Sequence, residues 1–226
     1  DTSKIDYSTP DMKAQPTLEV DNLSLENKFK NVTFKLHKNE VLGITGLLGG
    51  GQNELALALF GATPADTGTI KVEGEEKKIK AIHDGVNAGF GYVPADRIRV
   101  GLFMEHPIAD NIVPVIVHTL GNKLGVLLPE SIKEYARKWV KKLDVKTPNV
   151  VLPAQSLSGG NQQRLVLAKW MASDPTVLLM DGPTVGVDIG SKAEIHELMR
   201  SMGKEGRGVI LISDDIPELI QVCSRI

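Results

Sequence analysis

The sequence predicts an α/β protein with a mostly parallel sheet, antiparallel strands near the N-terminus and a helical subdomain. Short apolar runs separated by helical patterns are typical of parallel strands joined by crossover helices. These runs cover residues 41–45, 177–180 and 209–212. Residues 18–20 and 32–36 alternate apolar with polar side chains, which indicates half-buried antiparallel strands. Between residues 101 and 164 the pattern is mainly helical instead.

Further elements follow from local signals along the chain. A helix is expected from Glu54 until Gly61 ends it, and another from Pro129, a start signal, to Leu143. The remaining expected elements are short strands at 69–72 and 91–93, helices starting near Ser158 and Pro217, and a helix over 191–202.

We expect residues 1–16, which contain Pro10 and Pro16, to be a linker, and residues 17–226 to be one domain. Within it, the core is expected at about 17–100 and 165–226, and the helical subdomain at about 101–164.

Composition excludes several classes of protein. The 26 basic and 28 acidic residues give a net charge of −2, without the basic excess typical of nucleic-acid-binding proteins. Cys223 is the one cysteine, which excludes an internal disulfide framework. The five histidines show no zinc-ligand spacing. No apolar stretch reaches the roughly 18 residues that a membrane span needs.

The first motif connects a predicted strand to a predicted helix. It has the position and length of a phosphate-binding P-loop, in which backbone N–H groups and a helix N-terminus face an anion. Its candidate binding residues are Gly46, Gly49, Gly50, Gly51, Gln52 and Asn53. Gln52 and Asn53 stand where the motif has lysine and Ser/Thr, so an ordinary glycine-rich turn remains an alternative. A dinucleotide fingerprint fits worse, because its third glycine would fall on Glu54.

The second motif is LSGGNQQ at 157–163, where Ser158, Gly159 and Gly160 begin a helix and Gln162 follows. A hydroxyl and free N–H groups at a helix start suit an anion. In the alternative reading, Ser158 is an ordinary helix cap. The string resembles the signature motif of ABC-type ATPases, in the form found in sugar importers.

The third motif is VLLMDGPT at 177–184, which places the Asp181 carboxylate at the carboxyl end of a buried strand. It resembles the Walker B strand of the same family, whose Asp holds Mg²⁺, and the following D-loop would end at Asp188. The resemblance runs from about residue 18 to 226. The whole chain therefore resembles an ABC ATPase, a P-loop NTPase fold. It is most similar to the second, C-terminal and degenerate, nucleotide-binding domain of fused sugar importer ATPases.

Four positions depart from the family's catalytic pattern. Gln52 replaces the phosphate-binding lysine, Gly182 the catalytic glutamate, Asp214 the switch histidine, and Ala95 the Q-loop glutamine or glutamate. The resemblance therefore implies no intact catalytic residue in this chain's own site, and the isolated domain is expected to be weak or inactive as an ATPase. Asn53 and Asp181 remain the candidate ligands of Mg²⁺, and ATP is the implied cofactor.

The resemblance further implies an ATP-binding component of a sugar importer, in which this signature loop completes the ATP site of a partner domain. The expected partners are another ABC nucleotide-binding domain, fused N-terminally in a longer chain, and transmembrane permease subunits; a periplasmic or extracellular sugar-binding protein would act indirectly. The location would be the cytoplasmic face of the inner membrane. The alternatives are a structural or regulatory ABC domain that no longer binds nucleotide, and an ABC ATPase acting on ribosomes or DNA.

Overall fold

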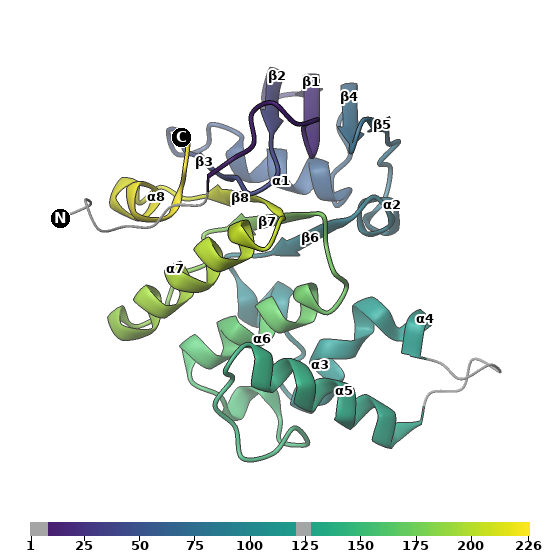
Figure 1. The fold of residues 1–226 in the computed structure, drawn as a ribbon, viewed down its shortest axis with the longest axis vertical. Helices are drawn as coiled ribbons and strands as arrows, with labels where there is room; N and C mark the ends of the chain where they lie inside the picture. Colours follow the sequence, from purple (N-terminus) through teal and green to yellow (C-terminus); the bar gives the residue numbers. More distant parts are fainter. Residues whose placement is uncertain (1–8, 121–127) are drawn as a thin grey trace. The chain divides into compact units, whose positions relative to one another are not determined.

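The structure, a computed structural model, describes residues 9–120 and 128–226 (Figure 1). The chain divides into two compact units. The first unit comprises Asp1–Tyr92, Pro175–Gly182 and His196–Ile226; the second comprises Val93–Asp174 and Pro183–Ile195. Residues 9–16, at the expected linker, form turns and irregular backbone without a helix or strand.

The first unit contains an antiparallel sheet with the strand order β2-β1-β4-β5. The strands are β1 (Leu18–Leu25), β2 (Phe29–Leu36), β4 (Thr67–Val72) and β5 (Glu75–Glu76). Leu18 pairs with Leu36, and both are buried, which confirms the antiparallel pairing expected from the alternating pattern. Positive φ angles at Asn27 and Asn31 flank the start of β2.

The same unit contains a second sheet with the order β3-β8-β7-β6. Its strands are β3 (Val41–Ile44), β6 (Phe90–Val93), β7 (Val177–Asp181) and β8 (Gly208–Ile212). β3 and β7 both pair in parallel with β8, which confirms the parallel arrangement. Every residue of β7 and β8 is buried, which explains why these strands are continuously apolar instead of alternating.

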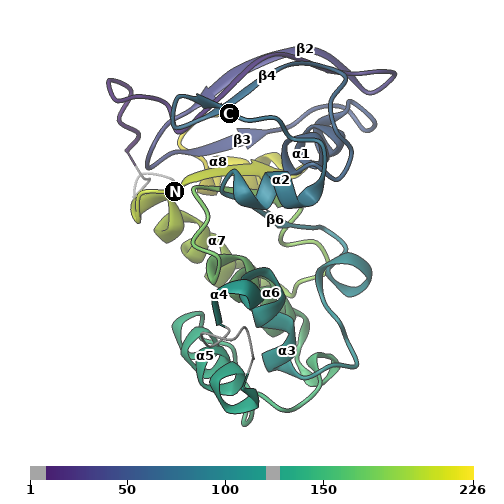
Figure 2. The ribbon, with the colours of Figure 1, turned by 90° about the vertical axis from the view of Figure 1, so that its right-hand side faces the viewer.

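Helix α1 (Gln52–Phe60) contacts β2 of one sheet and β7 of the other, and Figures 1 and 2 show it between the sheets. Gly61 ends it with a φ of 84°, as the sequence predicts. The glycine cluster lies in the loop that joins the carboxyl end of β3 to the start of α1. The unit also contains α2 (Ile82–Asn87) and α8 (Ile216–Val222), while α7 (Ile189–Lys204) begins in the second unit.

The second unit is helical. Its helices are α3 (Ile108–Ile112), α4 (Val117–Leu120), α5 (Pro129–Lys142) and α6 (Gly159–Met171), with 3-10 turns at Val113–Ile116 and Ala154–Ser156 and a π-helical turn at Arg97–Gly101. Its core includes Ile108, Ile112, Ala136 and Leu165, all fully buried. α5 starts at Pro129, as predicted.

The sequence divides core from subdomain at about residues 100 and 164, whereas the compact units divide near Tyr92, Asp174, Gly182 and Ile195. The boundaries drawn from the sequence stay a prediction. In the part of the chain that the structure describes, no helix is both long and apolar enough to cross a bilayer.

Candidate functional site

The glycine loop between β3 and α1 is preformed in the first unit. Gly49 and Gly51 have φ angles of 77° and 91°, which side-chain-bearing residues rarely adopt. A Cβ on Gly51 would also overlap the backbone carbonyl of Lys28. The Gly50 N–H donates to the Leu47 carbonyl at 2.8 Å, which closes a tight turn. The loop is therefore a tight turn that depends on its glycines, and its role in phosphate binding stays a prediction.

Gln52 occupies the lysine position with a side chain that lies inside the loop. Its Nε2 donates to the Leu47 carbonyl at 3.1 Å, and the residue is only 8% exposed. Its amide also lies against Gly46 and Gly50. An amide in this place can donate a hydrogen bond to a phosphate but supplies no positive charge.

Asn53 and Asp181 meet in the first unit. The Asn53 Nδ2 donates to Asp181 Oδ1 at 3.1 Å, and the Tyr92 hydroxyl donates to Asp181 Oδ2 at 3.1 Å. Burial raises the pKa of Asp181, the hydrogen bond from Tyr92 lowers it, and the negative charges of Asp214 and Glu54 raise it. The carboxylate expected at this strand end is therefore present, buried and held by two donors.

The geometry of this pair fits a magnesium ion. Mg²⁺ binds oxygens at about 2.0–2.1 Å, so neighbouring ligand oxygens lie about 3 Å apart. Asn53 and Asp181 have this spacing, and a half-turn of the amide would present its oxygen in place of Nδ2. No group of three His, Cys, Asp or Glu side chains suited to a metal occurs within residues 9–120 and 128–226. Mg²⁺ usually binds through one or two protein carboxylates together with phosphates and water, so a site with few protein ligands is compatible with this ion.

The strand ends that carry the expected catalytic positions lie in the same unit. Gly182 follows β7 with a φ of 50°, and its N–H donates to the Ile212 carbonyl of β8. Asp214 follows β8 and is exposed, and its charge acts on Asp181. Gly182 has no side chain that could act as a base, and Asp214 places a carboxylate after β8.

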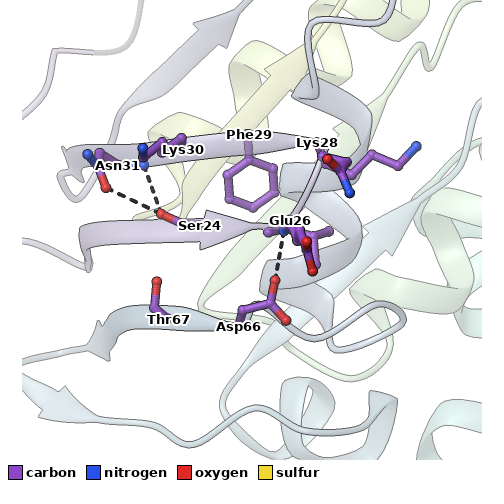
Figure 3. A pocket seen from close by; sticks show the side chains of 10 residues that line it. Ser24, Glu26, Lys28, Phe29, Lys30, Asn31, Asp66 and Thr67 are labelled. Carbon is purple, nitrogen blue, oxygen red and sulfur yellow. Dashed lines mark hydrogen bonds between the residues drawn. The ribbon is translucent and has the colours of Figure 1, made fainter.

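A hollow of about 670 Å³ lies on the β1–β2 hairpin and the start of β4, and Lys28 and Phe29 of its lining also approach Gly51 of the loop (Figure 3). Two of its polar groups are already paired: Asp66 accepts from the Glu26 N–H at 2.7 Å, and Ser24 Oγ accepts from the Asn31 N–H at 2.9 Å. The ring of Phe29 forms part of the lining. The sequence analysis did not identify this hollow, because its residues lie in a hairpin with no motif.

The signature turn lies in the second unit, where Ser158 stands at the N-cap position of α6. Its hydroxyl makes no capping hydrogen bond and instead accepts from Asn161 Nδ2 at 2.8 Å. Ser158 is exposed. Because its hydroxyl does not cap the helix, the first N–H groups of α6 remain available. The ordinary-cap reading of Ser158 is therefore wrong for its side chain.

Gln162 and Asp188, both expected to bind the cofactor, have partners within the second unit. Gln162 is 8% exposed, and its Nε2 donates to the Leu157 carbonyl at 3.0 Å. Asp188 is exposed and accepts from the Ser191 N–H at 3.0 Å, which caps α7 and lowers the pKa of Asp188. Their contacts favour supporting roles, and binding by either residue stays a prediction.

The expected site residues thus form two groups. The first unit brings together the loop from Gly46 to Asn53 with Asp181, Gly182 and Asp214, and the second holds the signature residues and Asp188. Two residues with clear contacts were missed, Tyr92 and Arg97. Ala95, at the Q-loop position, was the sequence signal that pointed near Arg97.

Comparison with known proteins gives a family. The family model for ABC transporters matches residues 29–185. A ribose import ATP-binding protein of Rhizobium etli is 41% identical over 209 residues, which cover 92% of this chain and 41% of that protein. A ribose import ATP-binding protein of Oceanobacillus iheyensis is 37% identical, covering 94% and 42% of the two chains. The chain thus spans about two fifths of the length of these relatives.

Solved structures show the same fold. A nucleotide-free ATP-binding cassette from an ABC transporter has a TM-score of 0.77 at 20% identity, covering 92% of this chain and 85% of that one. A dimeric cassette in a post-hydrolysis state with ADP and phosphate has a TM-score of 0.73 at 19% identity, covering 89% of each chain. Together with the family match over 29–185, this shows that the chain is an ATP-binding domain of the ABC transporter family.

Proposed function

We propose that this domain is the ATP-binding component of a sugar importer, and that it works asymmetrically. Its signature loop completes the ATP site of a partner ABC domain, while its own P-loop site binds nucleotide weakly and hydrolyses it slowly or not at all. The observation that carries the proposal is the exposed Ser158 turn, whose hydroxyl does not cap α6, in a chain whose P-loop has an amide at the lysine position. The matched relatives named as ribose importers support the substrate class.

The weakness of the chain's own site follows from its residues. Loss of one preorganised donor at a developing charge typically costs on the order of 3 kcal/mol, and Gln52 lacks the charge of lysine. A positioned general base is worth about 10²–10⁴-fold, and Gly182 has no side chain to act as one. The carboxylate of Asp214 would repel a phosphate, and Ala95 offers no amide. These losses do not add simply, but each lowers the hydrolysis rate.

Weak binding can survive through parts of the site that remain. The backbone N–H groups of the loop and the N-terminus of α1 suit a phosphate. Asn53 and Asp181 would hold Mg²⁺, which supplies positive charge that neutralises phosphate oxygens. Phe29 lines a cavity together with loop residues Gly50 and Gly51 and offers an apolar surface to the rest of a nucleotide.

The proposed partners are a second ABC domain, N-terminal in a longer chain, and permease subunits in the inner membrane, with a sugar-binding protein acting indirectly. The domain would then lie at the cytoplasmic face. The proposed permease surface is the region of about 94–128, of which residues 121–127 lie outside the part of the chain that the structure describes. Ile112 and Ile116 lie in this stretch but are buried core residues, so they are not part of the proposed surface. The exposed apolar side chains of this stretch include Ile98, Val100 and Phe103.

A thermal melt of the chain with and without Mg-ATP tests nucleotide binding. Ligand at about 100 times its Kd adds about 2.7 kcal/mol, which raises the Tm of a protein of this size by roughly 5–11 °C. A saturable shift supports the proposal. No shift at millimolar ATP would favour the alternative, a structural or regulatory ABC domain that no longer binds nucleotide. Copurification with a permease, and not with ribosomes, separates the importer from the other alternative, an ABC ATPase acting on ribosomes or DNA.

A further inference from the structure

Arg97 is a buried arginine whose guanidinium lies among backbone carbonyls of the second unit. It is 8% exposed. Its Nη1 donates to the Val185 carbonyl at 2.8 Å, and its Nη2 donates to the Gly186 carbonyl at 3.0 Å. The planar fork of arginine thus binds two successive carbonyls of the loop that follows Gly182. A lysine ammonium could not reproduce this two-pronged contact in one plane.

The same guanidinium contacts the signature helix. Arg97 Nε lies 3.4 Å from Gln162 Oε1, and the Gln162 Nε2 donates to the Leu157 carbonyl at 3.0 Å. Leu157 is the first residue of the LSGGNQQ string. A chain of hydrogen bonds therefore leads from the loop carbonyls, through Arg97 and Gln162, to the backbone just before Ser158.

The two signature glycines allow neighbouring side chains to approach the signature backbone closely. A Cβ on Gly159 would lie 2.9 Å from Arg97 Nη2 and 3.3 Å from the Gly186 carbonyl oxygen. A Cβ on Gly160 would lie 2.6 Å from the Cβ of Ser191, at the start of α7. The glycines therefore let Arg97 and the first turn of α7 approach the signature backbone closely, in addition to leaving its N–H groups open.

The positive charge of Arg97 is held without a paired carboxylate. Among the residues that the structure describes, no Asp or Glu lies within ion-pairing distance of its guanidinium, although Asp96 accepts from the Arg99 N–H in the same turn. A buried cation usually needs hydrogen-bonding partners to offset its lost hydration. Here the Val185 and Gly186 carbonyl oxygens and the Gln162 side-chain oxygen fill this role.

We propose that Arg97 is a positioning residue that ties the signature loop, 157–160, to the loop 183–188. It would hold the Ser158 turn in one conformation, and it would couple a conformational change in either loop to the other loop. The relevance to a partner's nucleotide rests on the proposed function. The link that Arg97 makes between the two loops does not rest on the proposed function, because it consists of contacts within this chain.

Hydrogen–deuterium exchange of the whole chain tests the tie without any nucleotide. In Arg97→Lys and Arg97→Gln, amides of 157–163 and of 183–191 should exchange about tenfold faster, while those of α3 and α5 keep their rates. Arg99→Lys is the matched control, because Arg99 lies in the same turn with a side chain that is 87% exposed. It should leave every region unchanged. If Arg97→Gln does not fold, Arg97→Lys, which keeps the charge and loses the fork, still decides the question.

Three results would overturn the proposal: unchanged exchange in both loops, faster exchange in only one of them, or a uniform increase over the chain that matches a loss of stability in urea. The outcome is separable from the function. If Ser158→Arg has no effect on ATP hydrolysis in the assembled transporter, the proposed function fails while the exchange result still stands. In that assembly, Arg97→Lys should lower kcat about tenfold with a smaller change in KM.

Discussion

The side-chain amide of Asn53 lies 3.1 Å from Asp181 Oδ1 and 3.4 Å from Oδ2, across 128 residues of sequence. One residue lies in the first turn of α1, and the other ends β7. This hydrogen bond therefore joins α1 to the carboxyl end of β7, although the two elements are far apart in the chain. This contact substitutes an amide for the hydroxyl of the usual P-loop motif.

Asn53→Ala should destabilise the protein, because it removes a hydrogen bond to a buried carboxylate. Hydrogen bonds to charged groups contribute about 1.5–3 kcal/mol, so the free energy of unfolding at pH 7 should fall by about that amount. Urea denaturation measures it. Asn87→Ala is the control, since Asn87 is exposed on α2 and should change little. Equal effects of the two substitutions would contradict the role given to Asn53.

Tyr92→Phe should destabilise the protein more at pH 7 than at pH 4. The hydroxyl donates to Asp181, whereas the ring, which stacks on Phe60 with centroids 5.3 Å apart, is kept. The pKa of Asp181 is raised in the folded state, so its protonated form is favoured and stability falls as pH rises through the folded pKa. Losing the Tyr92 donor raises this pKa further.

The penalty of Tyr92→Phe therefore appears once Asp181 is ionised, and it should amount to about 1.5–3 kcal/mol at neutral pH. Urea titrations of both proteins from pH 4 to 8 measure it. A penalty independent of pH would mean that the hydroxyl does not act through the Asp181 carboxylate.

Gly160→Ala should displace the start of α7 from the signature helix, because the new methyl would lie 2.6 Å from the Ser191 Cβ. Overpacking of this kind typically costs about 1–3 kcal/mol. Ser191→Gly removes the opposing side chain, so the double variant should recover a large part of the lost stability. A thermal or urea double-mutant cycle gives the coupling energy. Additive effects would show that the two residues do not press on each other.

Much of the fold could be predicted from the sequence, since its signals are local. Gly61 ends α1, Pro129 starts α5, and the apolar runs become the buried parallel strands. The short helix α2 and the π-helical turn at Arg97–Gly101 were missed, because neither has a long periodic pattern.

The site residues that belong to a sequence motif could be predicted. Those that depend on contacts between residues far apart in the chain could not. The hydrogen bond from Tyr92 to Asp181 joins two neighbouring strands, and nothing in a buried tyrosine signals its partner. The hydrogen bond from the Gln162 side chain to the Leu157 carbonyl could not be predicted either, because a motif gives residue types and not side-chain directions. Local hydrophobicity alone does not separate core from interface, so it could not decide that Ile112 and Ile116 are buried.

The ATPase rate of the assembled transporter carrying Ser158→Arg tests the central claim most directly. Ser156→Arg is the matched control, because Ser156 is also exposed and its hydroxyl only donates to the Pro153 carbonyl. The account predicts that Ser158→Arg lowers the rate at least tenfold, since a bulky cation would fill the turn that completes the partner's site, while Ser156→Arg leaves the rate near that of the unmodified protein. An unchanged rate with Ser158→Arg would contradict the claim that this signature loop serves the active ATP site.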